Sequence, residues 1–413
     1  MARVGCNNKI KDVERKGLLQ ISPLQSDLLD LSRWVAAFLV VIEHLRSLMF
    51  SDYRTGEGVG LVGRSFYFLT GFGHSAVVIF FVMSGFLVGG KALERLSLQE
   101  FSWPEYAINR TSRLYAVYIL ALILGGALDF FGYHYLNRFG LYDQSFSDRI
   151  AIVNFNFHEN LSPSIFALNL GMCQTVLGPV FGSNGPLWSL ANEFWYYLVG
   201  PILFSLLFWR GRRAAILSLA ALTALVLFLP AKIIGYSILW FMGAALYFVN
   251  SRKLLPLWIP LLMFAVSFSL ARWESVNVPS FVIGVSFALL INSAVGNSRR
   301  LPWRRLSRKA ADFSYSAYLC HFPFLVFVLS AIYQVSGRGV RGPLTAWALM
   351  PFFLVLTLAY VWCYGVSLVT ERQTPRIREW LYRFSLGRDV SREQNVAGQK
   401  THGMAVATEV EEI

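Results

Sequence analysis

The sequence predicts an all-α membrane protein with about ten transmembrane helices and both termini in the cytoplasm. Three observations support this prediction. Of the 413 residues, 55% are hydrophobic and only 15% are charged, and the mean hydropathy of +0.49 is too high for an ordinary soluble domain. Apolar stretches close to the length of a bilayer crossing recur along the chain. Most of the 37 Lys and Arg residues fall in alternate connections between these stretches.

We expect each apolar stretch to form a helix, because a helix satisfies its own backbone hydrogen bonds within lipid. The expected spans are 32–50, 74–91, 112–131, 187–208, 214–230, 233–249, 254–271, 277–294, 313–335 and 343–369. The connections rich in Lys and Arg lie on the same side as the N-terminus, so the positive-inside rule places that side in the cytoplasm.

Three regions follow from these bounds. Residues 1–31 are expected to form a cytoplasmic segment without a removable signal peptide, and residues 371–413 a cytoplasmic, largely disordered tail. Between them, residues 32–370 form the transmembrane domain, with its longest outer loop at 132–186. The net charge of +13 fits basic loops facing anionic lipid headgroups, so no nucleic-acid partner is expected. No clustered His and Cys pattern predicts a metal site.

Arg33 and His44 are eleven residues apart in the first apolar stretch. At about 100° per residue they share one helix face, roughly 16 Å apart along the axis. Ionisable groups inside an apolar span are costly, and their default interpretation is functional. His44 is therefore a candidate general base that takes a proton from a hydroxyl near neutral pH. The alternative is an inert histidine exposed to headgroups.

Arg110 and Arg113 are three residues apart at the predicted cytoplasmic entrance of the third span, so they share a face. Together with Arg33, expected at the same depth, they predict a clamp for phosphate or pyrophosphate groups. The alternative is ordinary positive-inside charge that reaches the interface. In the second span, Ser84 and Gly85 interrupt a bulky apolar run, either for close helix packing or to make room for a slender acyl chain.

Two later segments carry further polar groups. Glu193 is expected about two turns inside its span, where a carboxylate needs a partner or a proton. It could form a structural ion pair, orient the candidate base or bind the acceptor. Trp188 stands where an interfacial aromatic belongs. Tyr315, Tyr318 and His321 follow at intervals of three residues and predict a polar stripe that lines a cavity.

Taken together, five blocks resemble the integral-membrane acyltransferase family 3, which modifies bacterial carbohydrates. The blocks are LLDLSRWVAAFLVVIEH (28–44), IFFVMSGFLV (79–88), NRTSRLYAVY (109–118), GPLWSLANEFWYY (185–197) and FSYSAYLCHFP (313–323). They occur in the order of the family and cover most of residues 28–370. Two positions depart from it: Ala116 stands where the family often has proline, and Asn109 where it often has another arginine.

The resemblance assigns roles to the positions already singled out. It implies His44 and Glu193 as catalytic residues, and it implies binding of the acyl donor by Arg33, Arg110, Arg113, Ser84 and Gly85. It implies that the acceptor or the cavity is lined by Trp188, Tyr315, Tyr318 and His321.

The activity that the resemblance implies is O-acyl transfer across the bacterial inner membrane, by a multi-pass acyltransferase that transfers groups other than amino-acyl groups. The donor would be cytoplasmic acyl-CoA, first of all acetyl-CoA, with succinyl as a second acyl group. It would be a co-substrate, and no permanently bound cofactor is expected. The acceptor would be a carbohydrate or lipid-linked glycan, as in O-antigen, capsule, exopolysaccharide or lipo-oligosaccharide. Direct transfer and a transient acyl-histidine both fit these residues.

Two other functions compete with this one. A glycolipid or polysaccharide transporter or flippase would also place charges inside the membrane, but it predicts broken helices and symmetric halves, and the sequence shows no such repeat. A polytopic acyltransferase that lipidates proteins would also use a membrane histidine. The arginine blocks of this chain do not suggest that second class.

Overall fold

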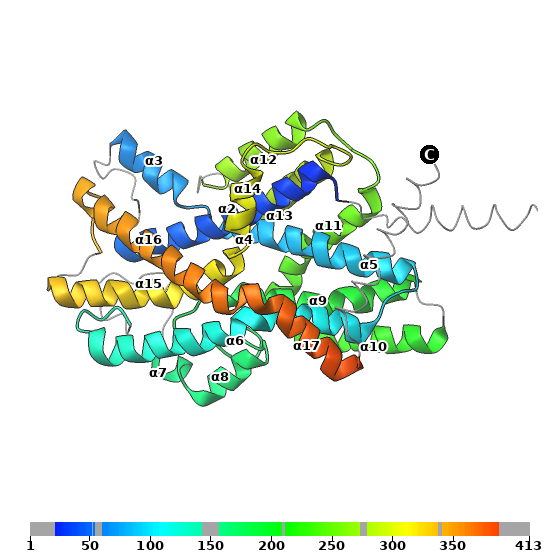
Figure 1. Ribbon diagram of the computed structural model, residues 1–413, viewed down its shortest axis with the longest axis horizontal. Helices are drawn as coiled ribbons and strands as arrows, with labels where there is room; N and C mark the ends of the chain where they lie inside the picture. Colours follow the sequence, from blue (N-terminus) through cyan, green and yellow to red (C-terminus); the bar gives the residue numbers. More distant parts are fainter. Residues whose placement is uncertain are drawn as a thin grey trace, which may run out of the picture.

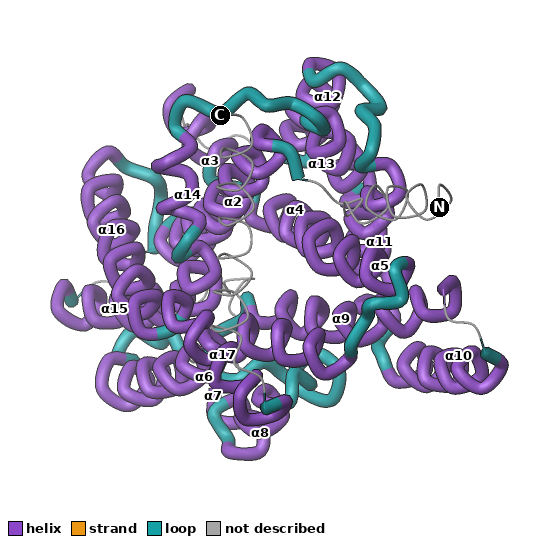
Figure 2. The backbone as a smooth tube through the Cα atoms, turned by 45° about the vertical axis from the view of Figure 1, so that its right-hand side comes forward, coloured by secondary structure: helices purple, strands orange, loops and turns teal. Residues whose placement is uncertain are grey.

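The computed structural model describes residues 21–51, 53, 60–142, 157–208, 211–272, 279–337 and 341–387. All regular elements among these residues are helices. Most of the long helices run roughly along the longest axis of the molecule, as Figure 1 shows, and Figure 2 shows them packed beside one another. The all-α prediction is confirmed for this part of the chain.

Each of the ten expected stretches overlaps a helix. In chain order the helices are α2 (Pro23–Met49), α3 (Leu61–Leu69), α4 (Gly73–Ser84), the π-helix η1 (Gly85–Gly89), α5 (Gly90–Ser97), α6 (Trp103–Leu136), α7 (Phe157–Asn160), α8 (Pro163–Leu170), α9 (Leu187–Phe208), α10 (Arg212–Phe228), α11 (Ala231–Val249), α12 (Trp258–Leu270), α13 (Ser280–Ser293), α14 (Arg304–Ala311), α15 (Ser314–Ser336), α16 (Ala346–Val369), the 3-10 helix η2 (Glu371–Gln373) and α17 (Thr374–Leu386).

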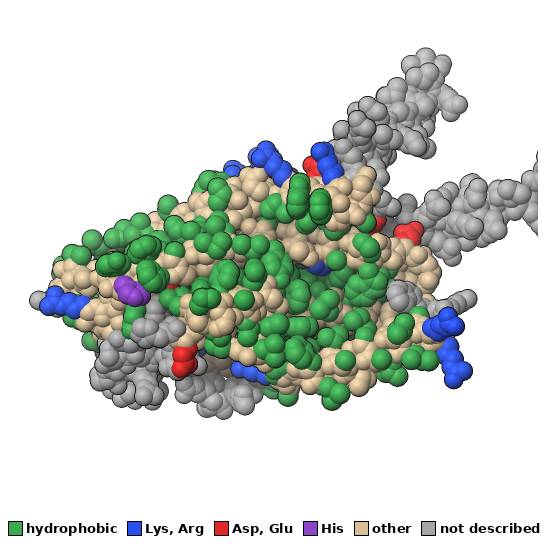
Figure 3. Space-filling model, turned by 90° about the horizontal axis from the view of Figure 1, so that it is seen from below, with side chains coloured by type: hydrophobic (Ala, Val, Ile, Leu, Met, Phe, Trp, Pro, Cys, Tyr) green, Lys and Arg blue, Asp and Glu red, His purple; other side chains and the backbone are tan. Residues whose placement is uncertain are grey.

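Six helical stretches in the described ranges are long and apolar enough to cross a membrane. They are Leu61–Ser97, Trp103–Leu136, Leu187–Phe208, Ala231–Val249, Ser314–Ser336 and Ala346–Leu386. The helices α10, α12 and α13 are shorter, and α2 is long but carries several charged residues. Ten crossings and the cytoplasmic termini therefore stay predictions. Apolar side chains cover much of the face in Figure 3, while most of its Lys and Arg lie near the ends and edges.

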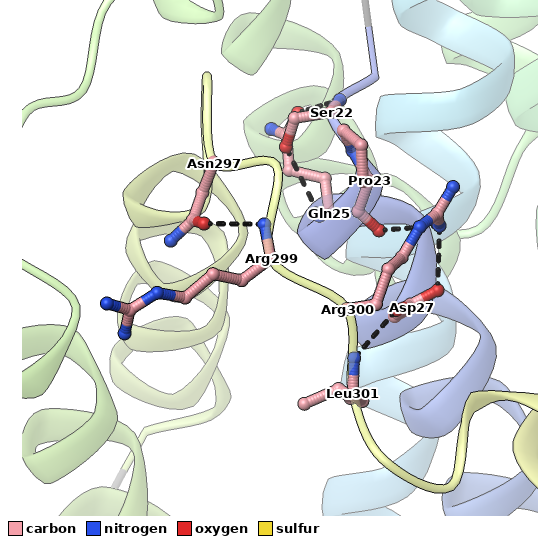
Figure 4. A network of polar contacts seen from close by, with 8 residues as sticks. All are labelled: Ser22, Pro23, Gln25, Asp27, Asn297, Arg299, Arg300 and Leu301. Atoms are coloured by element: carbon pink, nitrogen blue, oxygen red, sulfur yellow. Dashed lines mark hydrogen bonds and ion pairs between the residues drawn. The ribbon is translucent and has the colours of Figure 1, made fainter.

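The helix α2 begins at Pro23, well before the expected start at residue 32. Ser22 and Gln25 form a capping box, in which the Gln25 N–H donates to the Ser22 hydroxyl (3.3 Å) and the Ser22 N–H to the Gln25 side chain (3.0 Å). One turn later, Asp27 pairs with Arg300 at 2.9 Å (Figure 4). These contacts fix the start of α2 against the connection between α13 and α14.

Proline inside α15 does not break that helix. Pro323 lacks an N–H, so the carbonyl of Leu319 has no helical donor. The side-chain amide of Asn184, just before α9, donates to this carbonyl at 2.8 Å. The carbonyl of Leu319 thus exchanges a helical donor for a side-chain donor, and this hydrogen bond ties α15 to the start of α9.

The π-helix η1 packs against α11 so closely that the two backbones are in contact. A methyl group added to Gly85 would overlap the carbonyl oxygen of Trp240, and one added to Gly243 would overlap the carbonyl of Val82. Glycine at both positions lets the two helices approach this closely. Of the two interpretations of the serine–glycine pair, close packing therefore describes Gly85.

The C-terminal tail and the longest outer loop contain more helix than we expected. Residues 374–386, placed in a disordered tail, form α17, which packs along α6. The side-chain amide of Asn109 donates to the hydroxyl of Tyr382 at 2.9 Å and joins the two helices. The outer loop 132–186 contains the last turn of α6 and the short helices α7 and α8. Residues 143–156 of that loop and 388–413 of the tail lie outside the described residues.

Candidate active site

A cavity of about 290 Å³ lies between α2, α4, η1, α6, α9 and α15. Seven of the predicted site residues line it: Arg33, Ser84, Arg110, Arg113, Glu193, Tyr315 and Tyr318. They come from all five of the sequence blocks. The structure thus brings together groups that are up to about 280 residues apart in the chain, as separate helices bundle side by side.

The three arginines of the cavity differ in their partners. Arg33 pairs with Asp30, one turn earlier on α2, at 3.2 Å. The guanidinium of Arg110 lies over the rings of Tyr106 and Tyr197, at 5.8 and 5.9 Å from their centroids. Neither Arg110 nor Arg113 forms an ion pair with another described residue. Their charge is therefore available to an anionic ligand.

The residues that line the cavity include fewer carboxylates than guanidinium groups. Glu193 is the one acidic residue among those that line it. Glu371 lies behind the lining, where it accepts hydrogen bonds from the backbone N–H (3.1 Å) and the hydroxyl (3.0 Å) of Ser316, and it attracts Arg33 and Arg113. Arg33 is paired with Asp30, whereas Arg110 and Arg113 form no ion pair with a described residue, so these two guanidinium groups are the ones that favour an anion in the cavity.

Glu193 is held by a chain of side-chain hydrogen bonds. The hydroxyl of Tyr197 donates to Glu193 Oε1 at 2.5 Å. Ser84 Oγ lies 3.3 Å from the same hydroxyl and accepts a hydrogen bond from the indole of Trp240 at 3.2 Å. Because the hydroxyl proton of Tyr197 goes to the carboxylate, the hydroxyl of Ser84 donates to Tyr197. Ser84 therefore faces the cavity, although its neighbour Gly85 faces α11.

The sequence interpretation missed Tyr197 and Ser189. Both share a face of α9 with Glu193, since the three residues are spaced by four. Ser189 Oγ lies 2.6 Å from the hydroxyl of Tyr318 and links α9 to α15. The helical spacing from Glu193 was the signal that could have identified both residues.

His44 does not line the cavity but pairs with His321. His44 Nδ1 lies 2.8 Å from His321 Nε2, and the two ring planes differ by only 9°. His321 is buried, and its Nδ1 lies 2.9 Å from the carbonyl oxygen of Ala317. The ring of Tyr318, which lines the cavity, lies 6.3 Å from that of His321. The ring partner of His44 is therefore His321, and the structure does not place Glu193 in the orienting role considered for it.

Trp188 lies outside the cavity, at the start of α9. Its ring is 6.2 Å from Phe81, a lining residue, and 5.5 Å from Tyr236 on α11. His74, at the start of α4, completes this aromatic group, with its ring 6.2 Å from Tyr236. The starts of α4, α9 and α11 thus meet around Tyr236. Contact between Trp188 and the acceptor stays a prediction.

No cluster of three or more His, Cys, Asp and Glu residues able to hold a metal ion occurs within the described part of the chain. The polar groups of the site are guanidinium, imidazole, hydroxyl and single carboxylate groups. This set suits binding of an anion and transfer of a proton.

Comparison with known proteins identifies the family of this chain. The family model of the acyltransferase domain matches residues 27–366, which include every residue of the site. The chain belongs to this family, the integral-membrane acyltransferase family 3. The six long apolar helical stretches of its described residues are those of a multi-pass membrane protein.

Two relatives share part of their length with this chain. An uncharacterized protein of Haemophilus influenzae is 28% identical over 159 residues, which are 38% of this chain and 60% of that protein. The acyltransferase MdmB of Streptomyces mycarofaciens is 24% identical over 175 residues, 42% of this chain and 38% of the relative. The match thus spans less than two thirds of either relative. No solved structure shows a significant match.

Proposed function

We propose that this acyltransferase moves an acyl group, acetyl first of all, from acyl-CoA to a hydroxyl of an envelope or exported carbohydrate. One observation carries the proposal: Arg33, Arg110 and Arg113, from two helices, converge on a single cavity. Coenzyme A carries a diphosphate and a further phosphate, which guanidinium groups bind well. A cavity of about 290 Å³ suits the slender pantetheine arm, with the nucleotide outside its mouth.

Glu193 and Ser84 line the same cavity and would contact the arm. The amide N–H groups of pantetheine are donors, and a carboxylate held by Tyr197 is a suitable acceptor. Phe80 and Tyr318, whose rings are 5.4 Å apart, both line the cavity, and Tyr318 contacts His321. A thioester that passes Tyr318 would approach the histidine pair.

The reaction then needs one base and no redox partner. His44 takes the proton of the acceptor hydroxyl, and the oxygen forms a bond to the thioester carbonyl carbon. The carbon–sulfur bond breaks, coenzyme A leaves as the thiolate, and the proton on His44 passes to the sulfur. A transient acyl group on His44 would use the same residues in two steps.

The acceptor would arrive at the opposite end of the site from the arginines. Trp188 and Tyr236 offer aromatic faces against which a sugar ring can pack. The positive-inside pattern supports a cytoplasmic position for the arginine end. With the chain in the bacterial inner membrane, the donor would come from the cytoplasm and the acceptor from the outer side.

NMR of purified envelope glycan tests this proposal. Ester signals should be present in the wild-type strain, absent from a deletion strain and restored by the wild-type gene. They should be strongly reduced with the Arg113→Ala gene. A deletion strain with normal ester content per sugar but less exported polymer would contradict the proposal and favour a transporter. Radiolabelled acetyl-CoA followed into protein, not polysaccharide, would favour a protein acyltransferase.

A further inference from the structure

The hydrogen bonds of the two histidines determine which nitrogens carry protons. His321 Nδ1 lies 2.9 Å from the carbonyl oxygen of Ala317, and a carbonyl oxygen can only accept. His321 Nδ1 must therefore carry the proton of the neutral ring, which leaves Nε2 as an acceptor. His44 Nδ1, 2.8 Å from that acceptor, must then be the donor. The remaining nitrogen, His44 Nε2, is left with a free lone pair.

The geometry of the pair suits a direct hydrogen bond between the nitrogens. The ring centres are 5.1 Å apart while the nitrogens are only 2.8 Å apart, and the planes differ by 9°. Rings stacked face to face would not bring two nitrogens this close. The rings therefore meet edge to edge in nearly one plane, so that the N–H of one points along the lone pair of the other.

Packing holds both rings in this arrangement. Phe322 lies edge-on to His44, with centroids 5.2 Å apart and planes at 85°, and edge-on to His321 at 89°. His321 and Phe322 are fully buried on α15. Because the acceptor belongs to a buried helix, it can fix the direction of the His44 ring on α2.

We propose that His321 is a positioning residue that fixes His44 in the tautomer with Nδ1 protonated and Nε2 free. It deepens the proposed function, since the free Nε2 is the atom that would take the proton of the acceptor hydroxyl. After that step His44 carries a proton on each nitrogen, and His321 Nε2 still accepts from Nδ1. His321 thus takes the orienting place that a carboxylate holds in a Ser-His-Asp triad, with a neutral acceptor.

Nitrogen-15 NMR of the full chain with labelled histidine tests the tautomer without an activity assay. The chain has six histidines, and the spectra of His44→Gln and His321→Gln assign the two that matter. In the wild type, both rings should show a protonated Nδ1 and an unprotonated Nε2. In His321→Phe, which keeps a ring but removes the acceptor, His44 should shift towards the tautomer with Nε2 protonated. A wild-type His44 with Nε2 protonated would overturn the proposal, as would an unchanged His44 in His321→Phe.

Kinetics of the same variants tests whether the positioning matters for turnover. With purified protein, kcat should fall about 100-fold in His321→Phe, while KM for acyl-CoA stays unchanged. His321→Gln, whose side-chain oxygen can accept from His44, should recover part of kcat. Tyr333→Phe is the matched control, since its hydroxyl also joins α15 to α2, at 3.3 Å from the carbonyl of Leu48. It should retain wild-type kcat and the wild-type tautomer of His44.

The two proposals fail in different ways. Equal kcat in wild type and His321→Phe would overturn the positioning role, while transfer to carbohydrate by the wild type would still support the proposed function. No transfer from acyl-CoA to any carbohydrate by the wild type would overturn the proposed function. In that case the NMR spectra would still decide the tautomer.

Discussion

The arginine cavity and the histidine pair are built on opposite principles. In the cavity, Arg110 and Arg113 form no ion pair with a described residue, and Arg113 is exposed. In the histidine pair, three of the four ring nitrogens are used in internal hydrogen bonds, and His321 is fully buried. Charge left without a partner suits a region that binds a charged ligand. Groups held by internal bonds suit a region that must keep one geometry during a reaction.

The two regions meet at Tyr318. Its ring lines the cavity and contacts His321, and its hydroxyl lies 2.6 Å from that of Ser189 on α9. We expect the thioester to lie beside this residue during transfer. Substitutions in the cavity should therefore change donor binding, whereas substitutions in the pair should change turnover. The predictions below test this separation, beginning with the largest effect.

Replacing His44 by alanine should have the largest effect. Loss of a general base lowers turnover by about 10² to 10⁴-fold, and KM for acyl-CoA should stay near the wild-type value. Acyl transfer by purified protein at several donor concentrations measures both. His134→Ala is a matched control, because His134 lies at the far end of α6. Among the described residues its hydrogen-bond partner is the carbonyl of Phe130 on the same helix. Wild-type turnover in His44→Ala would remove the base from the mechanism.

Replacing Arg110 or Arg113 by alanine should weaken donor binding instead. A charge-assisted hydrogen bond contributes about 1.5–3 kcal/mol, so KM for acyl-CoA should rise about 10- to 100-fold. Arg113→Lys should fall between wild type and alanine, because an ammonium keeps the charge but not the planar fork. The control is Arg95→Ala, an exposed residue whose ion pair with Glu105 lies outside the cavity. A drop in kcat alone would contradict the binding role.

Replacing Tyr197 by phenylalanine should have a smaller effect. It removes the hydrogen bond to Glu193 and the link to Ser84, while the ring under Arg110 remains. We expect transfer efficiency to fall about 10-fold, as for one hydrogen bond to a charged group. Tyr247→Phe is the control, since it removes a hydroxyl that pairs with Ser97 away from the cavity. Equal losses in the two variants would show a general packing effect.

Replacing Ser22 by alanine should affect stability alone. It removes the cap of α2 and a hydrogen bond of 2.6 Å to the carbonyl of Ala294. The expected cost is about 1 kcal/mol of unfolding free energy, with unchanged kcat and KM. Thermal unfolding in detergent measures the first quantity and acyl transfer the others. Altered donor affinity would show that the anchored start of α2 also sets the position of Arg33.

The helices could be predicted because apolar length is a local property of the chain. All ten expected stretches are helical, and the α9 bounds agree to the residue. The start of α2 was missed because its first turns are polar and are stabilised by the capping box of Ser22 and Gln25. The helix α17 was missed because its stability comes from packing on α6, which hydropathy does not register.

The site was only partly predictable, because its geometry depends on which helices become neighbours. The arginine cluster was expected from placement at one depth, and the cavity brings its members together. The partner of His44 could not be predicted, because His321 reaches His44 only when α15 packs against α2. Whether Gly85 faces the cavity or α11 depends on the rotation of η1, because the wider turn of a π-helix changes which side chains face the cavity.

Binding of acyl-CoA to purified wild type, His44→Ala and Arg113→Ala, measured by calorimetry in one detergent, tests the separation of the two regions most directly. The wild type and His44→Ala should bind acyl-CoA with the same affinity, and Arg113→Ala should bind it about 10- to 100-fold more weakly. Equal weakening in His44→Ala and Arg113→Ala, or full affinity in Arg113→Ala, would contradict the account.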